Sequence, residues 1–177
     1  LHDALPIWVY QQKKYPPAEI KTGIIPVGTG NDWCRMYGIE LEYEEAIKVI
    51  SDEQTFVQDA ALVHYYDGEM PSSRYLINMA GIGYDAMVAQ KTNRQKERGK
   101  GGPLSYFYNI FYSLFKWDAV DTVIKVDDEV IRTSVFSINT GINRFNGNGL
   151  KQLPFAEPND GILDVTIIRK VGKMLVI

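Results

Sequence analysis

The sequence has a single cysteine, Cys34, and only two histidines among its 177 residues. One cysteine excludes an internal disulfide and favours a reducing environment. His2 and His64 are too isolated to indicate a metal site or a catalytic triad, and no Ser/His/Asp set emerges. The net charge of −3 gives no global sign of nucleic-acid binding, so no nucleic-acid partner is expected.

Long apolar runs are also missing, because no run approaches the roughly 20 residues that a membrane-spanning helix needs. Leu1–Ile7 is short and lacks the basic start of a signal peptide. The chain opens on Leu1 rather than Met and stops on Ile177 inside an apolar run, so we expect both ends to be cut. The composition, 45% hydrophobic and 23% charged, is typical of a chain with a folded core.

The first 53 residues follow an α/β pattern. Lys21–Ile25 is predicted as a short strand, and the glycine loop Gly28–Asp32 follows it. Trp33–Tyr37 is predicted to form one or two helical turns that end at Gly38. Leu41–Ser51 has apolar residues at helical spacing and is predicted as an amphipathic helix. A strand, a glycine loop and helices in this order indicate an α/β domain.

The second part, residues 54–177, is rich in β-branched and aromatic residues. The predicted strands are Thr55–Tyr66, Arg74–Ala80, Thr122–Val126, Val130–Asn139 and Ile162–Arg169. Asp127-Asp128-Glu129 is predicted as a hairpin turn between two of them. The expected fold class is therefore α/β plus all-β, with one domain over residues 1–53 and a second over residues 54–177.

One predicted helix, Leu104–Trp117, interrupts the β-rich part and is apolar on nearly every side. At about 21 Å for 14 residues it is too short to span a bilayer. Two interpretations stay open. The helix is either buried between sheets, or it is a wall of an acyl-chain pocket or a membrane-facing surface.

The loop Gly28-Thr29-Gly30-Asn31-Asp32 is the strongest candidate for a ligand site. Its two glycines allow the backbone to approach a ligand closely, and the N–H groups of the following helix favour an anion. The Thr29 hydroxyl is a donor for a phosphate, and Asn31 or Asp32 is a candidate helix cap. A tight left-handed turn with a capped helix remains the alternative. The loop is not a Walker motif, because no Gly-Lys-Ser/Thr follows.

Three other segments carry weaker signals. Gly81–Ala86 matches G-x-G-x-x-A, but no acidic residue ends a strand about 20 positions later, as a dinucleotide site requires. The basic stretch Lys91–Lys100 is either a solvated loop or an attractor for anionic head groups. Asn159-Asp160-Gly161 is predicted as a turn, in which Asp160 is either a plain turn residue or a ligand for a hard cation.

Four motifs, taken in order, resemble those of bacterial diacylglycerol kinase-like lipid kinases. They are Gly23–Asp32 (GIIPVGTGND), Asn78–Asp85 (NMAGIGYD), Gly147–Pro154 (GNGLKQLP) and Asn159–Asp164 (NDGILD). The resemblance runs from about Trp8 to Leu175, whereas Leu1–Ile7 matches nothing expected of the family. It implies an N-terminal α/β nucleotide domain, a C-terminal β-sandwich domain and an active site in the cleft between them.

The resemblance also implies a reaction, in which the γ-phosphate of Mg-ATP is transferred to the hydroxyl of diacylglycerol or a similar lipid. On that pattern Gly28–Asp32 belongs to the nucleotide site, and Thr29 contacts ATP. A structural magnesium would be held by the Asp160 side chain and by main-chain oxygens of Glu157 and Ile162. Diacylglycerol at the membrane surface is the implied partner, and phospholipid biosynthesis the implied process. The implied location is cytoplasmic with peripheral membrane contact, and a homodimer is left open.

Two departures from the family pattern matter. The Gly-Gly-Asp-Gly-Thr motif that cradles the ATP phosphates is absent here, and the later Asp-Gly-Glu motif with the general base is expected beyond Ile177. The chain is therefore expected to be an inactive fragment. Other hypotheses remain: a kinase of the same superfamily for a sphingoid lipid or NAD, a non-catalytic lipid-binding β-domain, and a Rossmann-type oxidoreductase.

Overall fold

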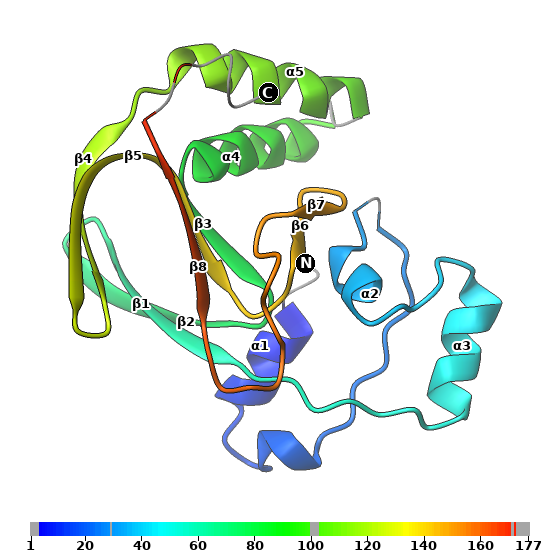
Figure 1. Cartoon of the computed structure of the whole chain (residues 1–177). Coiled ribbons are helices and arrows are strands. Elements are labelled where there is room, and N and C mark those ends of the chain that lie inside the picture. Colours follow the sequence, from blue (N-terminus) through cyan, green and yellow to red (C-terminus); the bar gives the residue numbers. More distant parts are fainter. Residues whose placement is uncertain (1–3, 29, 100–102, 171, 173–177) are drawn as a thin grey trace. The chain divides into compact units, whose positions relative to one another are not determined.

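The computed structural model describes residues 4–28, 30–99, 103–170 and 172 (Figure 1). By their internal contacts these residues form two compact units. The first contains the residues up to Ala80 together with Thr140–Asp164, and the second contains Gly81–Asn139 and the residues from Val165 on. Each unit is described separately, and the predicted domain boundary between residues 53 and 54 stays a prediction.

The first unit combines short helices with two antiparallel hairpins. Its elements are α1 (Ala4–Gln11), η1 (Pro17–Glu19), α2 (Asp32–Met36), α3 (Tyr43–Ser51), β1 (Ala61–Asp67), β2 (Met70–Leu76), β6 (Phe145–Asn146) and β7 (Leu150–Lys151). Strands β1 and β2 pair in the register Ala61↔Leu76 to Asp67↔Met70. Gly68, with a φ of 65°, forms the turn between them, because a left-handed position there favours glycine.

Two predicted strands of this unit are corrected. Lys21–Ile25 has no regular structure, since a strand needs a neighbour to pair its backbone groups. Its backbone instead lies against α3, where a Cβ on Gly23 would come within 2.8 Å of Ile50 Cδ1. The predicted strand Arg74–Ala80 is two strands, β2 and β3 (Met79–Gly83), separated by a bend at residues 77–78.

The two helices near the glycine loop follow the sequence more closely. Helix α2 ends as predicted, because Gly38 has a φ of 63° and the Ile39 N–H donates to the Cys34 carbonyl at 3.0 Å. Cys34 itself is buried. Helix α3 buries Ala46 completely, whereas Tyr43 and Ile47 on the same apolar side expose 52% and 49% of their surface. The described residues thus cover only part of its apolar face.

The second unit is built on a four-stranded sheet in the order β3-β5-β4, with β8 (Asp164–Arg169) also paired to β5 (Glu129–Gly141). Strand β4 (Val120–Val126) pairs antiparallel with β5 as far as Val126↔Glu129. Only Asp127 and Asp128 then connect the two strands, with Asp127 at a φ of 49°, which confirms the predicted hairpin turn.

Helices α4 (Tyr84–Glu97) and α5 (Pro103–Lys116) pack side by side in the second unit (Figure 1). The Tyr84 hydroxyl donates to the Ile110 carbonyl at 2.9 Å and joins the two helices. Since Phe107 and Phe115 of α5 expose 58% and 62% of their surface, the interpretation of this helix as buried between sheets is wrong. Among the residues described, no helix has both the length and the apolar character needed to cross a membrane.

Candidate functional site

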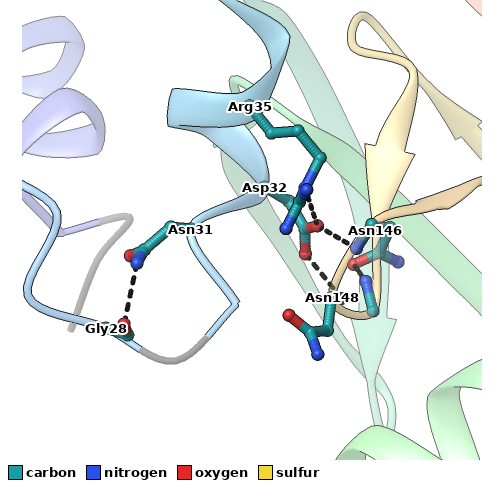
Figure 2. Close-up of polar contacts among 8 residues, drawn as sticks. Gly28, Asn31, Asp32, Arg35, Asn146 and Asn148 are labelled. Atoms are coloured by element: carbon teal, nitrogen blue, oxygen red, sulfur yellow. Dashed lines mark hydrogen bonds and ion pairs between the residues drawn. The ribbon is translucent and has the colours of Figure 1, made fainter. Parts of the chain in front are cut away.

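The glycine loop before α2 is shaped by Asn31. This residue is left-handed, with φ 48° and ψ 34°, a conformation that asparagine tolerates better than most residues. Its side-chain amide donates to the Gly28 carbonyl at 2.7 Å and closes the loop (Figure 2). The prediction that Asn31 caps the helix with its side chain is wrong, because that side chain makes no cap hydrogen bond. Thr29, the predicted ATP contact, lies outside the described residues.

Asp32 joins this loop to a second motif that is 116 residues away in the sequence. Its carboxylate accepts the Gly149 N–H at 2.6 Å and the Asn148 N–H at 2.9 Å (Figure 2). Gly147, Asn148 and Gly149 are consecutive left-handed residues, with φ values of 60°, 69° and 94°. Such a turn directs successive N–H groups to one side, where they bind an anion. The sequence predicts Asp32 as a residue of the nucleotide site or as a helix cap, and in the structure its carboxylate holds the β6–β7 turn.

Arg35 adds positive charge beside the same carboxylate. Its Nε lies 3.9 Å from Asp32 Oδ1, and the Arg35 side chain is 43% exposed. A Cβ on Gly149 would meet the guanidinium at 3.3 Å, so both space and backbone conformation favour glycine there. At 3.9 Å and with a partly exposed arginine this ion pair contributes little, so the two hydrogen bonds from Gly149 and Asn148 form the main link.

A hydrogen-bonded group around Gln58 supports α2 from the other side. Gln58 Oε1 accepts from the Trp33 indole at 2.6 Å and from the Tyr37 hydroxyl, and Gln58 Nε2 donates to the Ile77 carbonyl at 2.5 Å. Burial raises the pKa of the Tyr37 phenol, the hydrogen bond with Trp33 lowers it, and the charge of Asp59 raises it further. No sequence motif pointed to Gln58, because its partners come from two distant segments.

The start of the Asn78–Asp85 motif is fixed by the end of β5. The Ile142 N–H donates to the Asn78 carbonyl at 2.9 Å, and the side-chain amide of the fully buried Asn143 donates to the Ile77 carbonyl at 3.2 Å. A Cβ on Gly141 would lie 2.4 Å from the Asn78 carbonyl oxygen, so this glycine is needed for close backbone approach.

The end of that motif forms a polar cluster in the second unit. Asp85 Oδ2 accepts from Ser137 Oγ at 2.6 Å and from Asn139 Nδ2 at 2.7 Å, and both donor residues are fully buried. Gly81 lies inside strand β3, and Gly83 ends it with a Cβ position 2.8 Å from the Phe136 carbonyl. These glycines allow close packing and do not form a phosphate-binding turn, which argues against the dinucleotide hypothesis.

The predicted turn at Asn159-Asp160-Gly161 is confirmed, with Gly161 at a φ of 73°. Asp160 Oδ1 accepts the Ile162 N–H at 2.9 Å, which closes the turn locally. Asp59 accepts the Gly161 N–H at 2.7 Å and thereby anchors the turn to a distant segment. Asp59 is a further acidic residue of this loop that the sequence motifs did not identify.

The donor set of this loop suits a hard cation. The Glu157 carboxylate is paired with Arg144, so its main-chain oxygen is the atom left for a metal, as the family resemblance implies. Asp160 and Ile162 would add a carboxylate oxygen and a second main-chain oxygen. Oxygen-only donors are what magnesium and calcium prefer. Within residues 4–28, 30–99, 103–170 and 172, no group of three or more His, Cys, Asp or Glu side chains offers an alternative centre.

Solved structures share this fold. The crystal structure of a diacylglycerol kinase from Bacillus anthracis str. Sterne superposes with a TM-score of 0.57 and 22% identity, over 87% of this chain and 47% of that chain. The chain thus has the fold of a diacylglycerol kinase, with helices and antiparallel sheets.

The sequence comparisons identify the family of the chain. Residues 78–177 match the model of the YegS C-terminal NAD kinase beta sandwich-like domain, and residues 7–63 match that of the diacylglycerol kinase catalytic domain. The chain belongs to the diacylglycerol kinase family, as its motifs predicted. A diacylglycerol kinase of Staphylococcus epidermidis is 30% identical over 156 residues (88% of this chain, 46% of the relative), and one of Mycobacterium tuberculosis is 28% identical over 151 residues (84% and 47%). The chain spans about half the length of these curated relatives.

Proposed function

We propose that the chain is part of an ATP-dependent lipid kinase that transfers the γ-phosphate of ATP to the hydroxyl of diacylglycerol or a similar lipid. Family membership supports the kinase class. One structural observation supports it most directly. The Asp32 carboxylate hydrogen-bonds to the β6–β7 turn, and this brings the Gly23–Asp32 and Gly147–Pro154 motifs together in one site. A cytoplasmic, membrane-peripheral location belongs to the same proposal.

In this proposal the Gly28–Asp32 loop holds the nucleotide. Asn31 fixes the turn through its left-handed backbone and its bond to the Gly28 carbonyl. Asp32 is a positioning residue, because both of its carboxylate oxygens already accept backbone N–H groups. The partly exposed Arg35 guanidinium supplies positive charge at the loop and suits a phosphate. When bound, magnesium-ATP supplies the phosphoryl group, and the loop's task is orientation.

A structural magnesium in the loop of Glu157, Asp160 and Ile162 is the second part of the proposal. Asp59 and the Asx-type bond of Asp160 hold this turn in shape without a metal. A bound cation would therefore stiffen an already formed loop and add to the stability of the first unit. Thermal unfolding with and without added magnesium measures this. The midpoint temperature of unfolding should rise with magnesium in the natural chain and stay unchanged in Asp160→Asn.

We also propose that the 177-residue chain by itself is inactive. The phosphate-cradling motif is absent from its sequence, and the general base is expected beyond Ile177. The tripeptide Asp67-Gly68-Glu69 has the letters of the base motif, but it lies at the hairpin turn between β1 and β2. It therefore forms a turn and does not supply the base.

A radiolabelled ATP assay with lipid in mixed micelles tests both statements. The 177-residue chain should transfer no label. A longer chain, encoded by the DNA on both sides of this region, should label diacylglycerol, and Asp32→Ala in it should lower kcat/KM by tenfold or more. Parallel reactions with a sphingoid base and with NAD decide the acceptor. Transfer by the short chain would contradict its inactivity, and a longer chain that labels no acceptor would contradict the kinase proposal.

A further inference from the structure

The side-chain amide of Gln58 uses both of its ends in hydrogen bonds. Its Oε1 accepts from the Trp33 indole at 2.6 Å and from the Tyr37 hydroxyl. Its Nε2 donates to the Ile77 carbonyl at 2.5 Å and to the Asp59 carbonyl at 3.3 Å. An amide side chain offers one acceptor oxygen and two donor hydrogens, so all of these are in use. The orientation of the amide is therefore fixed, because a flipped amide would set its N–H groups against two other donors.

Asn143 closes this network into a ring. Its side chain is fully buried, and its Nδ2 donates to the same Ile77 carbonyl at 3.2 Å. Its Oδ1 lies 3.5 Å from the Tyr37 hydroxyl, which is the longest contact of the network. We name this set of groups the amide ring, and it consists of the Tyr37 hydroxyl, the Gln58 amide, the Ile77 carbonyl and the Asn143 amide. Since a hydroxyl has one hydrogen and Gln58 is the nearer acceptor, Gln58 is the main link to Tyr37.

The amide ring supplies support that helix α2 lacks on its own. With five residues, the helix is too short to be stable through its own hydrogen bonds. Trp33 and Tyr37 lie one turn apart, with ring centroids 5.3 Å from each other, and Gln58 binds both. At the start of the helix, the Asp32 carboxylate binds the β6–β7 turn. Helix α2 is thus held by two separate attachments, one at its first residue and one along its side.

The glycine loop takes its position from α2. Asn31 comes directly before the helix, and its carbonyl accepts the Arg35 N–H at 3.0 Å. The Asn31 side chain in turn donates to the Gly28 carbonyl at 2.7 Å. A rotation of α2 would therefore be transmitted through Asn31 to the backbone of the loop. In an enzyme site a displacement of about 1 Å is enough to lower the rate about a hundredfold.

We propose that Gln58 is a positioning residue of the nucleotide site. Through Trp33 and Tyr37 it holds α2, and with it the Gly28–Asp32 loop, in the orientation that receives the phosphates of ATP. Gln58 binds the helix that follows this loop, so its loss should affect the use of ATP and not the affinity for the lipid acceptor. The inference rests on the proposed function, because the nucleotide role of the loop belongs to that proposal.

Steady-state kinetics of the longer chain test the positioning role. Gln58→Met keeps the length of the side chain and removes all four hydrogen bonds. It should lower kcat/KM for ATP about tenfold or more, chiefly through a higher KM, and leave KM for diacylglycerol within about twofold. A purely structural role would reduce the fraction of folded enzyme, which lowers the apparent kcat and changes neither KM.

Tyr37→Phe is a second, milder variant of the same ring. It removes one bond to Gln58 and should raise KM for ATP about threefold, while adding little to the effect of Gln58→Met, because both changes break the same link. If Gln58→Met does not fold, Tyr37→Phe decides the question in both assays.

Gln12 offers a matched control. Its amide also makes four hydrogen bonds, all to main-chain groups near the end of α1, with Val9, Lys14 and Tyr15. Gln12 is half-buried, as Gln58 is. Gln12→Met should therefore lower the stability of the chain but leave KM for ATP unchanged.

Amide hydrogen exchange in the 177-residue chain tests the hold on α2 without turnover. The Arg35 N–H should exchange about tenfold faster or more in Gln58→Met and at the natural rate in Gln12→Met. The amides of β5 should keep their rates in both variants, which would show that the change is local.

Either of two results would overturn the inference. One is an active longer chain in which Gln58→Met leaves KM for ATP within about twofold, or raises the KM values of both substrates alike. The other is an unchanged Arg35 exchange rate in Gln58→Met. A longer chain that labels no acceptor would instead overturn the kinase proposal, and the nucleotide role of Gln58 with it, so the two failures are distinguishable.

Discussion

The link between Asp32 and the β6–β7 turn gives the sharpest prediction. Asp32→Ala removes the acceptor of two backbone N–H groups, at 2.6 Å from Gly149 and 2.9 Å from Asn148. A hydrogen bond to a charged group contributes about 1.5–3 kcal/mol, and water can replace only the exposed partner, Asn148. We therefore expect the free energy of unfolding to fall by about 2–4 kcal/mol. For a chain of this size the melting temperature should fall by about 4–16 °C.

Urea unfolding followed by tryptophan fluorescence measures the loss in free energy. Asp32→Asn keeps one acceptor oxygen and should lose less than Asp32→Ala. The control Arg35→Gln removes a long ion pair whose arginine is partly exposed, and it should cost less than about 1 kcal/mol. A second readout is amide hydrogen exchange, in which the Gly149 N–H should be protected in the natural chain and exposed in Asp32→Ala.

Either of two outcomes would refute this reasoning. One is an Asp32→Ala variant within about 0.5 kcal/mol of the natural chain, the size of an ordinary surface substitution. The other is an Arg35→Gln variant that loses as much as Asp32→Ala. That result would assign the link to the ion pair and not to the two N–H bonds.

Three further predictions concern residues in the first unit. Gly141→Ala should destabilise the fold by about 2 kcal/mol or more in a thermal melt, because its Cβ would lie 2.4 Å from the Asn78 carbonyl oxygen. The control Gly172→Ala places a Cβ that meets nothing within 4 Å, and it should leave the melting temperature unchanged. Burial raises the pKa of Tyr37 above its ordinary 10.0, so the unfolded state loses this proton first. The free energy of unfolding should therefore fall as the pH rises above about 10, and it should fall less steeply in Tyr37→Phe. Urea titrations at several pH values measure this, and the same dependence on pH in both chains would contradict the prediction. Burial also raises the pKa of the Cys34 thiol, so DTNB should react slowly in buffer and rapidly in urea, and fast labelling of the folded chain would show the thiol to be accessible.

Features fixed by neighbouring residues could be predicted from the sequence. The end of α2 at Gly38 and the turn at Asp127-Asp128 depend on backbone conformations that a few adjacent residues decide. Features that need a partner could not be predicted in this way. Lys21–Ile25 has the composition of a strand, but no strand among the described residues pairs with its backbone. The inward side of α5 was also missed, because Asn109 is stabilised by a neighbouring helix and not by helical periodicity.

The candidate site also has some features that the sequence predicts and others that depend on the tertiary structure. The amino-acid sequence alone determined the glycine loop, the order of the four motifs and hence the family, because these are patterns of residue type along the chain. Only the tertiary structure decided that Asp32 binds the turn at Asn148 and Gly149, and that Asp59 anchors the turn at Gly161. These hydrogen bonds join residues more than 100 positions apart, and no local spacing specifies which backbone N–H a carboxylate will meet once the chain has folded.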